Sequence, residues 1–156
     1  MGVTGCGKTT VGALLAEDCG WAFFDADDFH PAANVAKMKR GAPLTDEDRW
    51  PWLDRLNSFL LASERDGKSL VLACSALKQV YRDRLAGGCA ALRFVLLDGD
   101  RALIRARLGA RLGHYMNPNL LESQFAILER PQDALLLDAA ASPAALVRDI
   151  RSALGV

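Results

Sequence analysis

Short apolar runs alternate along the chain with longer segments in which apolar residues recur at helical spacing. The apolar runs predict strands at residues 21–25, 70–74, 92–97 and 135–138. Three of the four are apolar almost throughout, and only Arg93 interrupts the third, near its start. Strands of this kind are typical of a parallel sheet with helices on both faces. The alternation therefore predicts an α/β fold with a parallel sheet.

The boundaries of three helices follow from apolar spacing and from residues that favour helix ends. Apolar positions from Val11 to Cys19 predict a first helix, with Gly20 as its carboxyl-terminal stop. A long helix is expected to begin after Thr45, whose side chain can cap it, and to end before Gly67. Ser142–Pro143 is a favourable cap and first-turn pair for the last helix.

Length and charge limit the classes of protein that the chain can represent. Its 156 residues fit a single domain, 1–156, with little room for a second. Nineteen basic residues balance nineteen acidic ones, so no overall field attracts nucleic acid or a membrane surface. The four cysteines lack metal-binding spacing, and no apolar stretch is long enough to span a membrane. A cytoplasmic protein with reduced thiols is therefore expected.

A phosphate-binding loop stands at the start of the chain. Gly2–Thr9 matches G-x-x-x-x-G-K-[ST] in full and leads directly into a predicted helix. Its glycines allow backbone amides to surround phosphate oxygens, Lys8 can reach the β- and γ-phosphates, and the Thr9 hydroxyl can ligate Mg²⁺. We expect ATP to contact Gly2, Val3, Thr4, Gly5, Cys6, Gly7, Lys8, Thr9 and Thr10.

The strand that normally precedes such a loop is largely missing. Only Met1 remains where a strand of about five or six residues is expected. Loss of a buried central strand would leave two neighbouring strand edges unpaired. The expectation from sequence is that the true start of the protein lies upstream.

A second group of candidate residues follows the first predicted strand. Asp25 and Asp27 are two residues apart, so in an extended chain they share one face at the carboxyl edge of the sheet. One carboxylate is then expected to help hold Mg²⁺ with Thr9, and Asp27 to face an acceptor hydroxyl. His30, three residues after Asp27, is a candidate substrate contact. The alternative is an ordinary acidic turn at a strand end.

Basic residues recur near the ends of predicted elements. Arg49 follows Thr45–Asp48, and Lys78 and Arg82 follow the second strand. Arg107 and Arg111 precede a segment without clear periodicity at 112–119. Arg107 and Arg111 lie four apart on one helical face, so they could close over ATP phosphates as part of a lid at about 107–119. Each could instead be a solvated surface cation.

Read together, these blocks resemble the gluconokinases of the shikimate-kinase-like group. The matching blocks are Gly2–Thr9, Phe24–Pro31, Asn34, Lys37–Met38, Gly41–Leu44, Asp46–Arg49, Pro51–Leu53, Cys74–Lys78, Tyr81–Arg82, Arg107, Arg111, Gly113–His114, Ser123–Phe125 and Leu128–Glu129. They span nearly the whole chain in matching order. The phosphate loop alone identifies only a nucleotide-binding superfamily. The blocks around Asp27 and Lys78 occur in a much narrower group of proteins. Cys6 departs from the family, whose members often carry serine there.

The resemblance implies a P-loop kinase with a parallel five-stranded sheet, a homodimer, and transfer of the ATP γ-phosphate to the 6-hydroxyl of D-gluconate. It implies that Arg49, Lys78 and Arg82 contribute to the sugar-acid pocket, with Asp27 facing the acceptor hydroxyl. Lys8, Asp27, Arg107 and Arg111 would be the catalytic residues.

Two alternatives stay open at this point. The acceptor could be shikimate or a nucleoside monophosphate, or the chain could be a nucleotide-binding regulatory module with little turnover. A GTP-dependent switch is disfavoured, because the sequence contains no Asn-Lys-x-Asp element.

Overall fold

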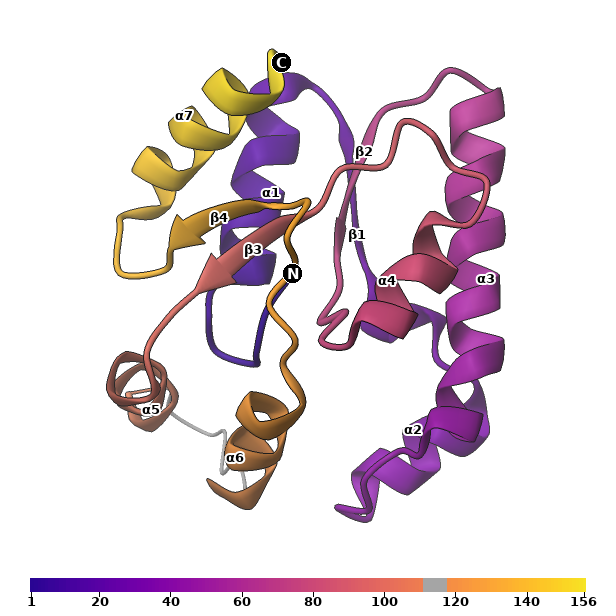
Figure 1. The fold of residues 1–156 in the computed structure, drawn as a ribbon, viewed down its shortest axis with the longest axis vertical. Coiled ribbons are helices and arrows are strands. Elements are labelled where there is room, and N and C mark those ends of the chain that lie inside the picture. Colours follow the sequence, from indigo (N-terminus) through magenta and orange to yellow (C-terminus); the bar gives the residue numbers. More distant parts are fainter. Residues whose placement is uncertain (111–117) are drawn as a thin grey trace.

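The computed structural model describes residues 1–110 and 118–156 of the chain (Figure 1). Its elements are α1 (Lys8–Cys19), β1 (Ala22–Asp25), the 3-10 helix η1 (Ala26–Phe29), α2 (Ala32–Lys39), α3 (Asp46–Arg65), β2 (Leu70–Ala73), α4 (Gln79–Ala86), β3 (Val95–Asp98), α5 (Arg101–Gly109), α6 (Pro118–Ile127), β4 (Leu135–Asp138) and α7 (Pro143–Leu154). Among the described residues, no helix is both long and apolar enough to cross a membrane.

The three helix boundaries predicted from sequence are confirmed. Gly20 ends α1 with a left-handed backbone, φ +68°, which glycine adopts without strain. Thr45 caps α3 in a reciprocal arrangement: its side chain accepts from the Asp48 amide, and the Asp48 carboxylate accepts from the Thr45 amide. Ser142 caps α7 in the same general way, with Pro143 in the first turn.

All four predicted strands are present, but they form two separate parallel pairs. β1 pairs with β2, and β3 pairs with β4. The third strand begins at Val95 rather than at Leu92, because β4 begins only at Leu135, which is the partner of Val95. The α/β class with parallel strands is therefore confirmed, while the sheet is divided in two.

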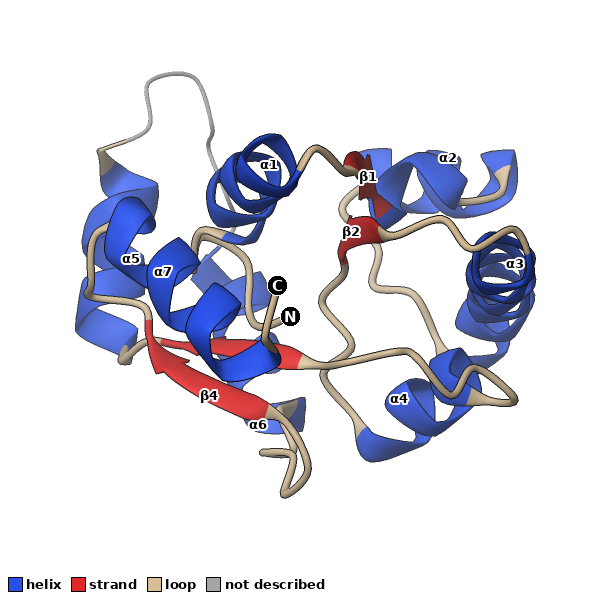
Figure 2. Cartoon of the chain, turned by 90° about the horizontal axis from the view of Figure 1, so that it is seen from above, coloured by secondary structure: helices blue, strands red, loops and turns tan. Residues whose placement is uncertain are grey.

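Helices cover both faces of the strands, as the apolar strand sequences predict. In β2, Val71 packs into the cluster formed with α1 and α7, whereas Leu70 and Leu72 pack into the cluster formed with α3 and α4. Side chains of a strand alternate between its faces, so the two clusters lie on opposite sides of β2. Figure 2 shows α1 and α7 on one side and α3 and α4 on the other.

Met1 and Gly2 lie between the two strand pairs and bond to both. The Met1 nitrogen donates to the Val95 carbonyl (2.5 Å), and the Leu97 amide donates to the Met1 carbonyl (3.0 Å). On the other side, the Gly2 amide donates to the Ser75 carbonyl (3.2 Å). This is the bonding of a parallel ladder. Met1 and Gly2 therefore bond as two residues of a central strand would, although they form no strand of their own.

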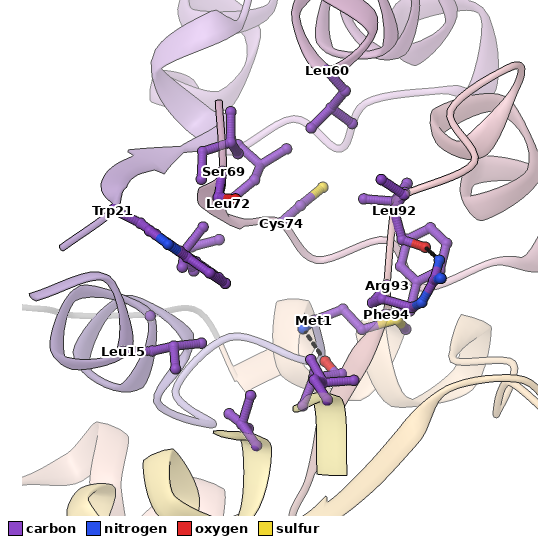
Figure 3. A pocket seen from close by; sticks show the side chains of 18 of the residues that line it. Met1, Leu15, Trp21, Leu60, Ser69, Leu72, Cys74, Leu92, Arg93 and Phe94 are labelled. Carbon is purple, nitrogen blue, oxygen red and sulfur yellow. Dashed lines mark hydrogen bonds between the residues drawn. The ribbon is translucent and has the colours of Figure 1, made fainter. Parts of the chain in front are cut away.

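A groove of about 490 Å³ occupies the space beside Met1 where the rest of such a strand would run (Figure 3). Its walls are largely apolar side chains from β2, α1 and the segment before β3, among them Leu15, Leu72, Leu92 and Phe94. Asp25, Asp27, His30, Arg49 and Lys78 are not among its lining residues. Lys8 does line the groove, so the groove adjoins the phosphate loop, but the predicted acceptor-side residues lie elsewhere.

Candidate functional site

The phosphate loop connects Met1 to α1 at the carboxyl edge of the strands, the lower edge in Figure 1. Gly2, Gly5 and Gly7 all have positive φ, at +132°, +81° and +106°. A Cβ on Gly5 would lie 2.9 Å from the Leu108 side chain, so both the backbone angle and the packing require glycine there. α1 begins at Lys8, which directs the positive end of its dipole at the loop.

Side chains around the loop fix its shape. Val3 and Cys6 are buried, so these two residues can offer a nucleotide only backbone groups. The Lys8 Nζ donates to the Val3 carbonyl (3.0 Å), which keeps the ammonium group beside the loop. A residue outside the loop, Gln124 on α6, accepts a hydrogen bond from the Thr4 amide at its Oε1 (2.7 Å). Thr10, the last predicted ATP contact, is exposed on α1.

Asp25 joins the end of β1 to the phosphate loop. Its Oδ2 accepts from the Thr9 hydroxyl (3.2 Å), and its Oδ1 accepts from the Asp27 amide (3.1 Å). A hydroxyl oxygen and a carboxylate oxygen thus lie side by side, as predicted. Such hard oxygen donors suit Mg²⁺, which binds through one or two protein groups plus phosphate and water. Among the described residues, no group of three or more His, Cys, Asp and Glu side chains could hold a metal by itself.

Asp27 lies in η1, directly after β1, and is open to solvent. Its side chain is 84% exposed. Partial removal from water by the surrounding loops, and then repulsion from Asp25, raise its pKa above the ordinary value. Because so much of the Asp27 side chain still contacts water, we expect the full increase of its pKa only when bound substrates cover the carboxylate. A carboxylate in this position can accept a proton from a hydroxyl group.

His30 faces Asp27 and is held on its other sides by packing. Its Nε2 lies 3.9 Å from the nearer Asp27 oxygen, and its ring stacks on Trp52 at a centroid distance of 4.3 Å. Asn34 contacts Nδ1 at 3.4 Å. Burial lowers the pKa of His30, with Asp27 acting in the opposite direction and Arg49 adding to the decrease. The imidazole is therefore neutral near pH 7 and suited to hydrogen bonding with a polar ligand.

Arg49 and Lys78 come together around one carboxylate, that of Asp46. Lys78 Nζ donates to both Asp46 oxygens (3.0 and 2.8 Å), and Arg49 Nη1 lies 3.7 Å from Oδ1. Tyr81 donates its hydroxyl to the same carboxylate and lies within cation–π distance of both basic groups, 5.6 Å for Arg49 and 5.3 Å for Lys78. Two basic residues that are far apart in sequence thus form one cluster.

Arg82 has a different environment from the other predicted substrate contacts. It is only 1% exposed, and its Nη1 donates to the carbonyls of Ala76 and Leu77 (2.9 and 3.0 Å). Its Nη2 donates to Oε1 of Gln79 (2.7 Å). Arg82 therefore holds the turn that leads to Lys78. A direct contact between Arg82 and a substrate stays a prediction.

Arg107 approaches the phosphate loop from the last turn of α5. Its Nη1 is 3.4 Å from the Cys6 carbonyl, which places the guanidinium at the loop as the sequence predicts. Arg111 lies outside the described residues, and so do residues 111–117 of the predicted lid. Pro118 and Asn119, which the sequence places in the loop at 112–119, instead form the start of α6.

Sequence reasoning missed three residues that organise this site: Asp46, Tyr81 and Trp52. All three stand in blocks that match the family, but the sequence alone assigns none of them a role. Trp52 does pack, but it also donates its Nε1 to the Ala26 carbonyl (2.8 Å) while stacking on His30. An acidic residue three positions before Arg49, on the same helical face, was the available signal for Asp46.

Comparisons with known proteins identify the family of the chain. Residues 4–123 match the family model described as shikimate kinase. A probable gluconokinase from Rattus norvegicus is 49% identical over 149 residues, covering 84% of this chain and 80% of the relative. The crystal structure of an unliganded sugar kinase from Janibacter sp. HTCC2649 has a TM-score of 0.92 at 43% identity, covering 100% of this chain and 92% of that one.

A gluconokinase structure from Sinorhizobium meliloti 1021 has a TM-score of 0.88 at 41% identity, covering 99% of this chain and 89% of that one. Family model, relative and structures all match across most of the chain. The chain therefore belongs to the gluconokinase family, within the shikimate-kinase-like P-loop kinases.

Proposed function

We propose that this protein is an ATP-dependent gluconokinase that transfers the γ-phosphate of ATP to the 6-hydroxyl of D-gluconate. The observation that carries the proposal is a series of neighbouring charged and polar side chains that starts at the phosphate loop. The Lys8 charge acts on Asp27, Asp27 lies 3.9 Å from His30, and the Arg49 charge acts on His30, while Arg49 and Lys78 share the Asp46 carboxylate. An acceptor with a hydroxyl at one end and a carboxylate at the other matches this order. The relatives named gluconokinase favour gluconate over shikimate or a nucleotide as that acceptor.

On this proposal, Gly2–Thr10 bind ATP, mainly through backbone amides and the dipole of α1. Lys8 carries a positive charge beside the loop, where it would stabilise charge on the β- and γ-phosphates. Arg107 would add a second positive group at the same loop. Arg111 keeps its predicted role in the lid at about 107–119.

Thr9 and Asp25 would hold Mg²⁺, because their adjacent oxygens match its preference for hard donors. When bound, the ion would neutralise phosphate charge and help to orient the γ-phosphate. Asp25 also accepts from the Asp27 amide, so the candidate metal ligand and the candidate base are held in fixed relation.

Asp27 would orient the acceptor hydroxyl and accept its proton. The hydroxyl oxygen forms a bond to the γ-phosphorus, the bond from that phosphorus to the β–γ bridging oxygen breaks, and ADP leaves with the electron pair. The hydroxyl proton passes to Asp27, whose raised pKa makes it a better acceptor than an ordinary aspartate. His30, neutral and rigidly stacked, would hydrogen-bond to the acceptor chain between the two ends.

Arg49 and Lys78 would bind the acceptor carboxylate. A chain without net charge cannot attract an anion by its overall field, so recognition depends on these positioned cations. Arg82 holds the turn that leads to Lys78, and a direct contact between Arg82 and the acceptor is a further part of the proposal.

The experiment that tests the proposed function is a coupled assay of ADP release with different acceptors. Gluconate should give turnover well above that with shikimate, nucleoside monophosphates or the uncharged polyol sorbitol. ATP binding without acceptor-dependent turnover would instead indicate a regulatory module. The proposal also includes a single kinase domain over 1–156, a homodimer and a cytoplasmic location. Light scattering of the purified protein tests the dimer.

A further inference from the structure

Asp46 is the shared partner of the groups that we assign to acceptor recognition. It stands in the first turn of α3, and its two oxygens accept from Lys78, while Oδ1 also accepts from the Tyr81 hydroxyl (2.5 Å). Lys78 and Tyr81 are 32 and 35 residues away in sequence. One carboxylate thus joins the start of α3 to the start of α4.

The cluster formed by Asp46, Arg49, Lys78 and Tyr81 has a defined charge. Hydrogen bonds from Lys78 and then from Tyr81 lower the pKa of Asp46, and the Asp46 hydrogen bond raises the pKa of Lys78. Asp46 and Lys78 are therefore both ionised near neutral pH, and a guanidinium such as that of Arg49 is always charged in proteins. Two positive charges and one negative charge leave a net charge of +1, which matches an acceptor with a single carboxylate.

The hydrogen bonds of Arg49 hold one end of its guanidinium. Nη1 donates to the Leu44 carbonyl (2.7 Å) and approaches the Tyr81 hydroxyl (3.5 Å). A guanidinium has five N–H donors, and the hydrogen bonds that Arg49 makes within the described residues all use Nη1. Its other nitrogens remain for a bidentate contact with a carboxylate. Tyr81, itself fixed by Asp46, therefore helps to keep Arg49 in position.

We propose that Asp46 is a positioning residue for acceptor specificity: with Tyr81 it holds Lys78 and Arg49 together and leaves the cluster one positive charge. This inference rests on the proposed function. The opposite possibility is that Asp46 competes with the acceptor carboxylate for the same cations. The two possibilities predict opposite changes in gluconate affinity. Competition predicts tighter gluconate binding when Asp46 is neutralised, whereas positioning predicts weaker binding.

The test is steady-state kinetics of Asp46→Asn, which keeps the shape of the side chain and removes its charge. We expect the KM for gluconate to rise about tenfold or more, because misplaced binding groups lose most of their effect. The KM for ATP should stay within about threefold, since the binding of ATP does not involve this cluster. Preference for gluconate over sorbitol should fall in parallel. Tyr81→Phe should give a smaller change in the same direction.

Asp54→Asn is the matched control, because Asp54 also lies on α3 and pairs with Arg84 of α4. Arg84 packs over Trp50 and, among the described residues, reaches the cluster only through the contact of Trp50 with Tyr81. Asp54→Asn should leave both KM values unchanged. Asp46→Glu keeps the charge and should restore part of the gluconate affinity, which a purely structural role for Asp46 would not require. If the gluconate KM of Asp46→Asn falls or stays constant, the positioning role is overturned. The proposed function still stands in that case, provided that the wild-type protein turns over gluconate. Wild-type protein without gluconate turnover overturns both.

Discussion

The Thr9 hydroxyl donates a hydrogen bond to Oδ2 of Asp25 at 3.2 Å, across an interval of sixteen residues. This contact ties the start of α1 to the end of β1. The same Asp25 carboxylate accepts from the Asp27 amide, so the ATP side and the acceptor side of the site share one anchor. Substitutions on the ATP side and on the acceptor side should therefore have different effects on ATP binding.

Lys8→Ala should lower kcat by about two orders of magnitude or more, because a positioned cation at the β- and γ-phosphates acts mainly on the transition state. The protein should remain folded, since the principal contact of the Lys8 ammonium is the Val3 carbonyl. Steady-state kinetics with gluconate, together with circular dichroism, checks both points. An unchanged rate would show that the loop does not bind the reacting nucleotide.

Asp27→Asn should depress kcat strongly and leave ATP affinity nearly intact, because the amide can still fill the space but cannot accept the hydroxyl proton. Isothermal calorimetry measures ATP binding independently of turnover. Equal loss of ATP binding would assign Asp27 to the metal site instead.

The pH dependence of kcat/KM for gluconate gives a second test of Asp27. Its pKa is raised, and a base works only when ionised, so activity should fall as the pH decreases through a pKa above the ordinary aspartate value of 3.8. In the Asp27→Asn variant the residual activity should lose this acidic limb. An acidic limb that survives the substitution would belong to another group.

The groove between β2 and β3 predicts an effect on stability. Adding an apolar segment of about five valine and leucine residues before Met1 should raise the melting temperature, because the segment can complete both ladders and fill the groove. A rise of about 4 °C or more is expected, since 1 kcal/mol corresponds to roughly 2–4 °C in a chain of this size. A segment of equal length with alternating proline and aspartate is the control. Equal effects of the two segments would show that the groove does not accept a strand.

Much of this fold could be predicted because local patterns decide it. The apolar runs at β1, β2 and β4 and the caps Thr45 and Ser142 depend on neighbouring residues alone. The start of β3 could not be predicted in the same way, because it depends on where its partner β4 begins. The division of the sheet likewise depends on pairing across the whole chain.

The site was predicted less completely than the fold. The phosphate loop and the Asp25–Asp27 pair lie within single motifs, and the structure brings them together as expected. Asp46 was missed because its hydrogen-bond partners Lys78 and Tyr81 lie 32 and 35 residues away in sequence. Arginine is so often exposed that the burial of Arg82 was not expected. A signal for Arg82 existed: it lies three residues before the buried Leu85, on the same helical face.

Arg49 is the residue to which we assign recognition of the acceptor carboxylate, and its substitution tests this assignment most directly. Loss of one partner of a bidentate Arg–carboxylate contact costs about 2–4 kcal/mol. Arg49→Lys should recover only part of this, because an ammonium group cannot reproduce the planar fork. The decisive measurement is the pair of KM values, for gluconate and for ATP, in Arg49→Ala. We predict a gluconate KM raised tens-fold or more, an ATP KM within a few-fold of wild type, and a reduced preference for gluconate over sorbitol. Similar changes in both constants would contradict the account and would place Arg49 outside the acceptor site.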